Sequence, residues 1–189
     1  MRKICFLISM IVCLLAQAQS TEKLYNQGKA LYDAKNYAKA FPLFQTAAQK
    51  GHKKAQYRLG LCYDKGRGVK EDDKQAFYWY GLSANQGYAK AQYQLGRCYK
   101  KGEGTTKDIT KAVALFSKAA KQDNADGLYA LGKCYLKGQG VAADKAMAKS
   151  LFQKAVRHKK DGKEILAKIR EDAKDGDEDA KQILTLIGK

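Results

Sequence analysis

The sequence predicts an all-α protein, an α-solenoid of antiparallel helix pairs that ends in a capping helical segment. Two observations lead to this prediction. The stretch Leu59–Gly68 returns in closely similar form at Leu95–Gly104 and at Leu131–Gly140, with a spacing of 36 residues both times. A fixed period of about 20 to 50 residues is typical of stacked repeats, in which each unit buries its apolar face against its neighbours. Within each unit, the apolar residues also follow helical spacing.

The N-terminal residues have the features of an export signal. Arg2 and Lys3 precede an uncharged, mostly apolar run at residues 4–15, and residues 16–18 supply a small-x-small cleavage pattern. The run of about twelve residues is shorter than the ~20 that a spanning helix needs, which makes a retained anchor the weaker interpretation. We therefore expect a signal peptide at residues 1–18, cleavage near Ala18, a periplasmic or secreted protein, and no transmembrane segment in the mature chain.

The rest of the chain divides by the repeat period. Residues 19–54 are expected to form a shorter first helical hairpin, because they lack the glycine loop of the later units. Three full units follow at residues 55–90, 91–126 and 127–162. At 163–189 the pattern decays into two short amphipathic helices, which we expect to cover the last apolar face of the array.

Each full unit combines small and bulky residues at fixed positions. A glycine inside a helix costs about 1 kcal/mol relative to alanine, so a glycine in the first helix of every unit indicates close contact with another helix. A bulky pair in the second helix would fill the space beside it. An aspartate is placed to cap that second helix. The glycines are Gly60, Gly96 and Gly132, the pairs are Trp79-Tyr80, Leu115-Phe116 and Leu151-Phe152, and the capping residues are Asp72 or Asp73, Asp108 and Asp144.

Three cysteines beyond the signal peptide, Cys62, Cys98 and Cys134, occupy the same position in each unit. In an exported protein, cysteines commonly form disulfides. Equivalent positions in stacked repeats, however, should lie about 8 to 10 Å apart, which exceeds the ~7 Å limit between the Cα atoms of a disulfide. No CxxC motif and no suitably spaced histidine accompanies them. We expect buried thiols, and neither a metal nor a cofactor.

The charge is uneven along the chain. Residues 19–160 carry 28 Lys and Arg against 11 Asp and Glu, whereas residues 161–189 carry 6 against 8. A strongly basic surface favours anionic partners, among them acidic proteins, anionic lipid headgroups and envelope polymers. Nucleic acid is not expected as a partner of an exported protein. Many of these lysines would also serve simply as solvated helix faces.

The run from Ala55 to Val69, followed by Asp73, Ala76, Trp79-Tyr80 and Gly87, closely resembles the Sel1-like repeat, a relative of the tetratricopeptide repeat. The resemblance covers residues 55–162, whereas residues 21–54 look more like a plain tetratricopeptide unit. It implies a right-handed superhelix that acts as a protein-interaction scaffold. A cysteine-rich branch of the family has been linked to β-lactamase activity, but that branch has two cysteines per repeat and this chain has one.

The resemblance also implies that the first helix of each unit lines a concave face, where residues four apart would lie together. Aromatic anchors and a row of cations there would suit a segment that carries carboxylates. The alternative is that the tyrosines are packing residues of the repeat. The candidate binding residues are Tyr25, Tyr57, Tyr93 and Tyr129, with Lys29, Lys65, Arg97, Lys101, Lys133 and Lys137.

Catalytic patterns are weak in this sequence. The three GxG loops lack the further residues of a phosphate-binding motif, and a helix-to-helix turn explains them. Residues 20–23 have the sequence pattern of an SxxK motif, but no SDN or KTG motif follows. We therefore predict no catalytic site and an exported, non-enzymatic scaffold or adaptor that binds an acidic protein or peptide segment. A binder of anionic envelope polymer or lipid headgroup is the alternative, and a β-lactamase-like hydrolase is a weaker one.

Overall fold

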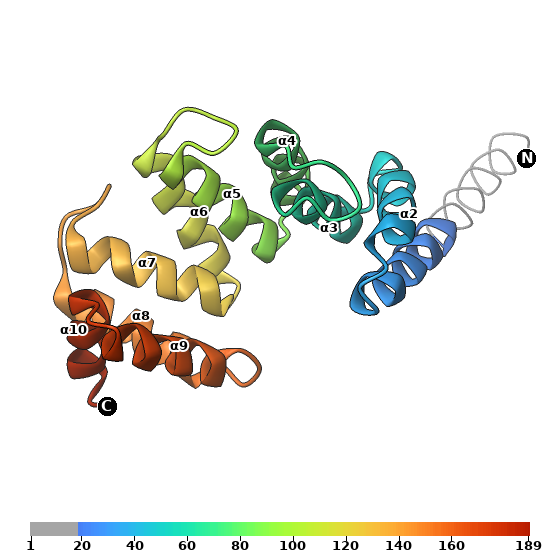
Figure 1. Cartoon of the computed structure of the whole chain (residues 1–189). Helices are drawn as coiled ribbons and strands as arrows, with labels where there is room; N and C mark the ends of the chain where they lie inside the picture. Colours follow the sequence, from blue (N-terminus) through green and yellow to red (C-terminus); the bar gives the residue numbers. More distant parts are fainter. Residues whose placement is uncertain (1–18) are drawn as a thin grey trace, which may run out of the picture. The chain divides into compact units, whose positions relative to one another are not determined.

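The computed structural model describes residues 19–189, so the predicted signal peptide at residues 1–18 lies outside the described residues. The regular elements of this range are all helices, which confirms the predicted all-α class. Residues 19–33 are helical, and the elements that follow are α2 (Tyr37–Gln49), α3 (Lys53–Asp64), α4 (Asp73–Asn85), α5 (Ala89–Lys101), α6 (Ile109–Lys121), α7 (Ala125–Lys137), α8 (Lys145–Arg157), α9 (Gly162–Lys174) and α10 (Glu178–Ile187) (Figure 1). Of the helices in residues 19–189, none is long and apolar enough to cross a membrane.

The helices belong to two compact units, one up to Gln86 and the other from Gly87 to Lys189. In the first unit, α3 packs against both α2 and α4. In the second unit, α5 packs with α6, α7 with α8, and α9 with α10 (Figure 1). Further contacts of α6 with α7, and of α8 with α9 and α10, join these pairs. Each unit is therefore a stack of helix pairs, as a solenoid requires.

The ends of the helices follow the predicted chemistry. Asp72 accepts a hydrogen bond from the backbone N–H of Gln75 at 3.0 Å, and Asp108 and Asp144 cap α6 and α8 in the same way. Such caps satisfy backbone donors that have no partner within the helix. Gly102 and Gly138 end α5 and α7 in the left-handed conformation, with φ of 82° and 64°. The GxG loops are thus helix-to-helix turns.

The glycine of each first helix lies against an aromatic ring of the second helix. A methyl group added at Gly60 would stand 2.6 Å from a ring carbon of Tyr80. The equivalent glycines Gly96 and Gly132 meet Phe116 and Phe152 at 2.6 and 2.7 Å. All three rings are at most 1% exposed. The second residue of each predicted bulky pair is therefore the one that fills the centre of its helix pair.

The three cysteines are buried thiols that form no disulfide. Cys62, Cys98 and Cys134 are at most 6% exposed, and none of them takes part in a disulfide. They pack as small apolar residues on the inner side of the first helices, where Cys62 joins the cluster of Tyr32, Phe44 and Leu59. The prediction of buried thiols is confirmed for these three residues.

The C-terminal helices attach to the last repeat through apolar contacts. Ile169 of α9 and Ile183 and Ile187 of α10 are buried in one cluster with Leu136 and Phe152. Asp177 begins α10 by accepting a hydrogen bond from the N–H of Ala180 at 3.0 Å. The turn between α9 and α10 is therefore anchored on both sides.

We expect the substitution Gly60→Ala to lower the free energy of unfolding by about 1–3 kcal/mol, because the Tyr80 ring is enclosed and cannot move away from the added methyl group. Gly81→Ala in α4 is the matched control, since its methyl group would meet nothing within 4 Å. This control should stabilise the protein by up to about 1 kcal/mol through helix propensity alone. Urea unfolding followed by circular dichroism measures both values, and equal effects of the two substitutions would contradict the packing argument.

Candidate functional site

The four predicted tyrosines share one structural role. Each ring packs against the buried aromatic ring of the next helix, at centroid distances of 5.7 to 6.1 Å, in the pairs Tyr25 with Phe44, Tyr57 with Tyr80, Tyr93 with Phe116 and Tyr129 with Phe152. Tyr25 is buried, 8% exposed, and also contacts the His52 ring, so it packs within the first unit. Tyr57, Tyr93 and Tyr129 are half-buried. Packing within the repeats therefore explains at least part of the surface of all four rings.

Most of the predicted cations already have an acidic partner. Of the six, Lys29 pairs with Asp33 at 2.7 Å, Lys65 with Asp64 at 3.3 Å, Lys101 with Glu103 at 2.9 Å, and Lys137 with Asp179. Ion pairs near the surface contribute about 0–1 kcal/mol each. They nevertheless lower the net positive charge of the predicted row of cations.

Arg97 and Lys133 differ from the other four, because no ion pair with a carboxylate forms for either of them in the part of the chain that the structure describes. The Arg97 guanidinium donates to the side-chain oxygen of Gln94 at 2.7 Å. The Lys133 ammonium lies 5.8 Å from the centroid of the Tyr129 ring, within the range of a cation–π contact. Both lie in the second unit, on α5 and α7, and both are half-buried. These two helices carry the strongest part of the predicted site.

Lys100 belongs with these cations, although sequence reasoning missed it. It is half-buried on α5, and burial lowers the pKa of its ammonium, with the nearby positive charges of Lys133 and Lys137 acting in the same direction. In residues 19–189 its ammonium makes no ion pair. Lys100 stands 36 residues before Leu136, which is buried, and this repeat equivalence was the signal that it turns inward. Steps of four residues from Tyr93 lead to Arg97 and Lys101 and therefore do not include Lys100.

Residues 171–179, which span the end of α9, the connecting turn and the start of α10, lie beside α7 and are called the acidic turn here. Burial raises the pKa of Tyr129 to about 12, and the negative charges of Asp172, Asp177 and Asp179 add to that effect. The hydrogen bond from Ala180 lowers the pKa of Asp177, and the charges of Lys133 and Lys137 also contribute. The charges that shift the pKa values of Tyr129 and Asp177 therefore place the acidic turn beside Tyr129, Lys133 and Lys137. Together with the Lys137–Asp179 ion pair, they show that acids from the C-terminal helices share the surface with the cations of α7.

Another part of the same unit is acidic. A cavity of about 660 Å³ is lined by five carboxylates, from Asp126 of α7 and from the α9 region, and by two lysines, Lys90 and Lys168. Burial and the neighbouring charges of Asp161 and Glu164 raise the pKa of Asp126. The face formed by the first helices of the second unit is therefore basic over the C-terminal halves of α5 and α7 and acidic beside α9. A basic row running the full length of the repeats, as the sequence suggested, does not describe it.

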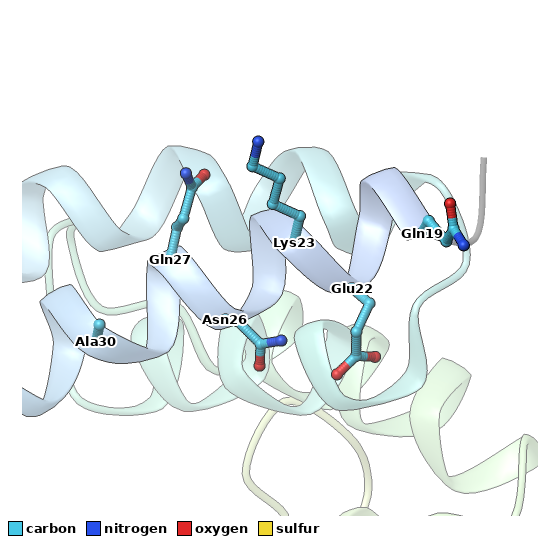
Figure 2. A pocket seen from close by; sticks show the side chains of 6 residues that line it. All are labelled: Gln19, Glu22, Lys23, Asn26, Gln27 and Ala30. Carbon is cyan, nitrogen blue, oxygen red and sulfur yellow. The ribbon is translucent and has the colours of Figure 1, made fainter. Parts of the chain in front are cut away.

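A second cavity, of about 630 Å³, lies along the helix at residues 19–33. Its lining residues all come from this one helix, as Figure 2 shows: Gln19, Glu22, Lys23, Asn26, Gln27 and Ala30. Glu22 is engaged by His52, whose ring nitrogen Nε2 lies 2.8 Å from its carboxylate. This cavity is the outer face of a helix, and it contains none of the predicted binding residues.

The groups suited to catalysis or metal binding are not brought together in the described part of the chain. Residues 19–189 contain no cluster of three or more His, Cys, Asp or Glu that could hold a metal ion. The two histidines act at helix starts, where Nδ1 of His52 accepts from Ala55 and Nδ1 of His158 accepts from Asp161, each at 3.2 Å. Ser20 and Lys23 of the SxxK spelling are both exposed along the first helix.

The sequence model of the Sel1 repeat matches residues 15–52, 53–88, 89–124 and 125–159. The first of these ranges covers most of the hairpin that lacks a glycine loop, residues 19–54. In sequence, the chain is similar to DAP3-binding cell death enhancer 1 of Rattus norvegicus and Mus musculus, 49% identical over 41 residues. That match covers 22% of this chain and 8% of either relative, so it spans little more than one repeat.

Two solved structures share the fold over most of the chain. A Sel1 repeat protein of Oxalobacter formigenes is 34% identical with a TM-score of 0.67, and the match covers 72% of this chain and 56% of that one. A protective antigen present in uropathogenic Escherichia coli strains, which displays an SLR fold, is 33% identical with a TM-score of 0.70, covering 77% and 32%. These likenesses confirm the predicted solenoid of helix pairs.

We expect the thiol of Cys62 to resist alkylation in the folded protein. Burial raises its pKa to about 11, so the reactive thiolate is scarce near neutral pH and the sulfur is also inaccessible. With iodoacetamide at pH 8, mapped by peptide mass spectrometry, Cys62 should react at least about tenfold more slowly than in urea. The urea sample of the same chain is the control. Similar rates in both states would show that the thiol is exposed and available for redox chemistry.

Proposed function

The chain belongs to the Sel1 repeat family, whose solenoids generally act as protein-interaction scaffolds, and we propose that it is an exported, non-enzymatic member that binds a protein or peptide segment of acidic character. The observation that carries the proposal is the pair Arg97 and Lys133. These cations lie on successive first helices of one unit without a carboxylate partner in the described residues, one turn after the half-buried Tyr93 and Tyr129. Aromatic edges next to free cations favour a segment that carries both apolar side chains and carboxylates.

The second unit supports this proposal more strongly than the first. In the first unit, Lys29 and Lys65 are paired with Asp33 and Asp64, and Tyr25 is buried. In the second unit, Arg97, Lys100 and Lys133 supply three cations that are half-buried. A charge that is partly shielded from water interacts more strongly with a bound carboxylate than a fully exposed one does. We therefore assign the proposed binding surface to α5 and α7.

An anionic envelope polymer or lipid headgroup is the second candidate partner. It is favoured by the excess of cations over the whole chain and by a cavity of about 510 Å³ at the end of α8, which Lys154, Arg157 and Lys159 help to line. Such binding would depend on net charge and would be screened by salt. For the β-lactamase-like alternative, no residue pair described above favours a hydrolase, and nitrocefin turnover above a buffer control would contradict the non-enzymatic proposal.

The partner proposal predicts that Arg97→Gln with Lys133→Gln weakens the binding of an acidic peptide by about tenfold, or ~1.4 kcal/mol, because two charge-assisted contacts are lost. The probe is a fluorescein-labelled peptide alternating glutamate and serine, followed by fluorescence anisotropy. A glutamine-serine peptide of equal length should bind weakly to all variants.

The matched control is Lys121→Gln with Lys149→Gln. These lysines lie exposed on the second helices α6 and α8, and their substitution removes the same amount of charge. It should change the affinity for the acidic peptide by less than twofold. An equal loss with both double variants would instead indicate that net charge drives binding, as expected for a polymer or lipid-headgroup binder.

The export proposal predicts that mature protein recovered from outside the cytoplasm begins at Gln19 or close to it. The basis is the charged start, the uncharged run and the small-x-small pattern of residues 1–18. N-terminal sequencing and intact mass measure the cleavage site. An uncleaved chain that starts at Met1 and is found in the cytoplasm would contradict the proposal.

A further inference from the structure

We infer that the acidic turn between α9 and α10 acts as an intramolecular competitor of the acidic partner, by occupying the α7 end of the proposed binding surface. This inference rests on the proposed function, because it concerns the same cations. It assigns regulation to the C-terminal helix pair in addition to its packing role.

The turn has the chemistry of the proposed partner. Residues 171–179 contain six carboxylates, Glu171, Asp172, Asp175, Asp177, Glu178 and Asp179, against one lysine, Lys174. This is the most acidic stretch of a chain whose overall charge is strongly positive. A segment of such composition is the kind of ligand that free cations on α5 and α7 would attract.

The ion pair of Lys137 identifies where the turn binds. The equivalent lysines of the two preceding repeats pair locally, Lys65 with the adjacent Asp64 and Lys101 with Glu103 two residues away. Lys137 pairs instead with Asp179, which lies 42 residues further along the chain. The Lys137 side chain is 37% exposed and that of Asp179 29%, so the pair is partly shielded from water. The last repeat therefore receives its carboxylate from the C-terminal helices.

The turn stays in place without this ion pair. The buried residues Ile169, Ile183 and Ile187 fix α9 and α10 against the last repeat, and Asp177 caps α10 through its own side chain. Removing the charge of Asp179 should accordingly free Lys137 without releasing the helices. An incoming acidic segment would then gain one more cation and face one less negative charge.

The test compares two neighbouring substitutions that remove the same charge. Asp179→Asn breaks the pair with Lys137. Glu178→Gln removes a carboxylate whose side chain is 82% exposed and which, among residues 19–189, pairs with Lys181 on its own helix alone. With the glutamate-serine peptide, we expect Asp179→Asn to raise the affinity by about three- to tenfold and Glu178→Gln to change it by less than twofold.

A third substitution isolates the role of Lys137. Lys137→Gln should cost little affinity in the wild-type protein, where this lysine is already neutralised, and should reverse the gain when combined with Asp179→Asn. Circular dichroism and the melting temperature verify that α9 and α10 remain folded in each variant. Equal effects of Asp179→Asn and Glu178→Gln, or a gain that persists in the double variant, would overturn the inference.

The outcomes separate this inference from the proposed function. If the wild-type protein and all variants fail to bind the peptide in a saturable manner, the proposed acidic partner is wrong. If the wild-type protein binds and loses affinity on Arg97→Gln with Lys133→Gln, but Asp179→Asn has no effect, the binding surface stands and the competing turn is wrong.

Discussion

The contact between a helical glycine and a buried aromatic ring is the constraint on which the rest of the structure depends. At Gly60, Gly96 and Gly132, the rings of Tyr80, Phe116 and Phe152 occupy the space that any side chain would fill. This approach sets the separation of the two helices in each pair. It also fixes which side of the first helix faces inward, where Cys62, Cys98 and Cys134 are buried. Tyr93, Arg97 and Lys133 lie half-buried beside this packed side, so the packing of the repeat decides where binding residues can stand.

The repeat period made most of the fold predictable. Short-range patterns that recur in each unit predicted the helices, the glycine turns, the aspartate caps and the buried thiols. Because the same local pattern occurs in several units, each occurrence supports the prediction made from the others. The candidate site was predicted less completely. Steps of four residues along each first helix predicted Arg97 and Lys133 but not Lys100. The reason is that Lys100 is half-buried through its position relative to α7. Sequence spacing within one helix carries no information of that kind.

Charge was the property that sequence reasoning described least well. The excess of lysine suggested a continuous basic row, whereas the structure pairs Lys29, Lys65 and Lys101 with acids close in sequence. The partner of Lys137 could not be predicted from spacing, because the ion pair depends on the way α9 and α10 fold back onto the last repeat. Long-range ion pairs are set by tertiary packing, and a helical surface can change from basic to acidic within one unit when a new helix joins it.

The cluster of Leu136, Phe152, Ile169 and Ile183 has a consequence for the synthesis of the chain. Earlier repeats bury their apolar faces against residues that lie in the next helix or two, so they can fold soon after they leave the ribosome. Leu136 and Phe152 have to wait until more than thirty further residues beyond Phe152 have emerged and Ile183 is available. Until then, the growing chain exposes one apolar face, which α9 and α10 remove from water.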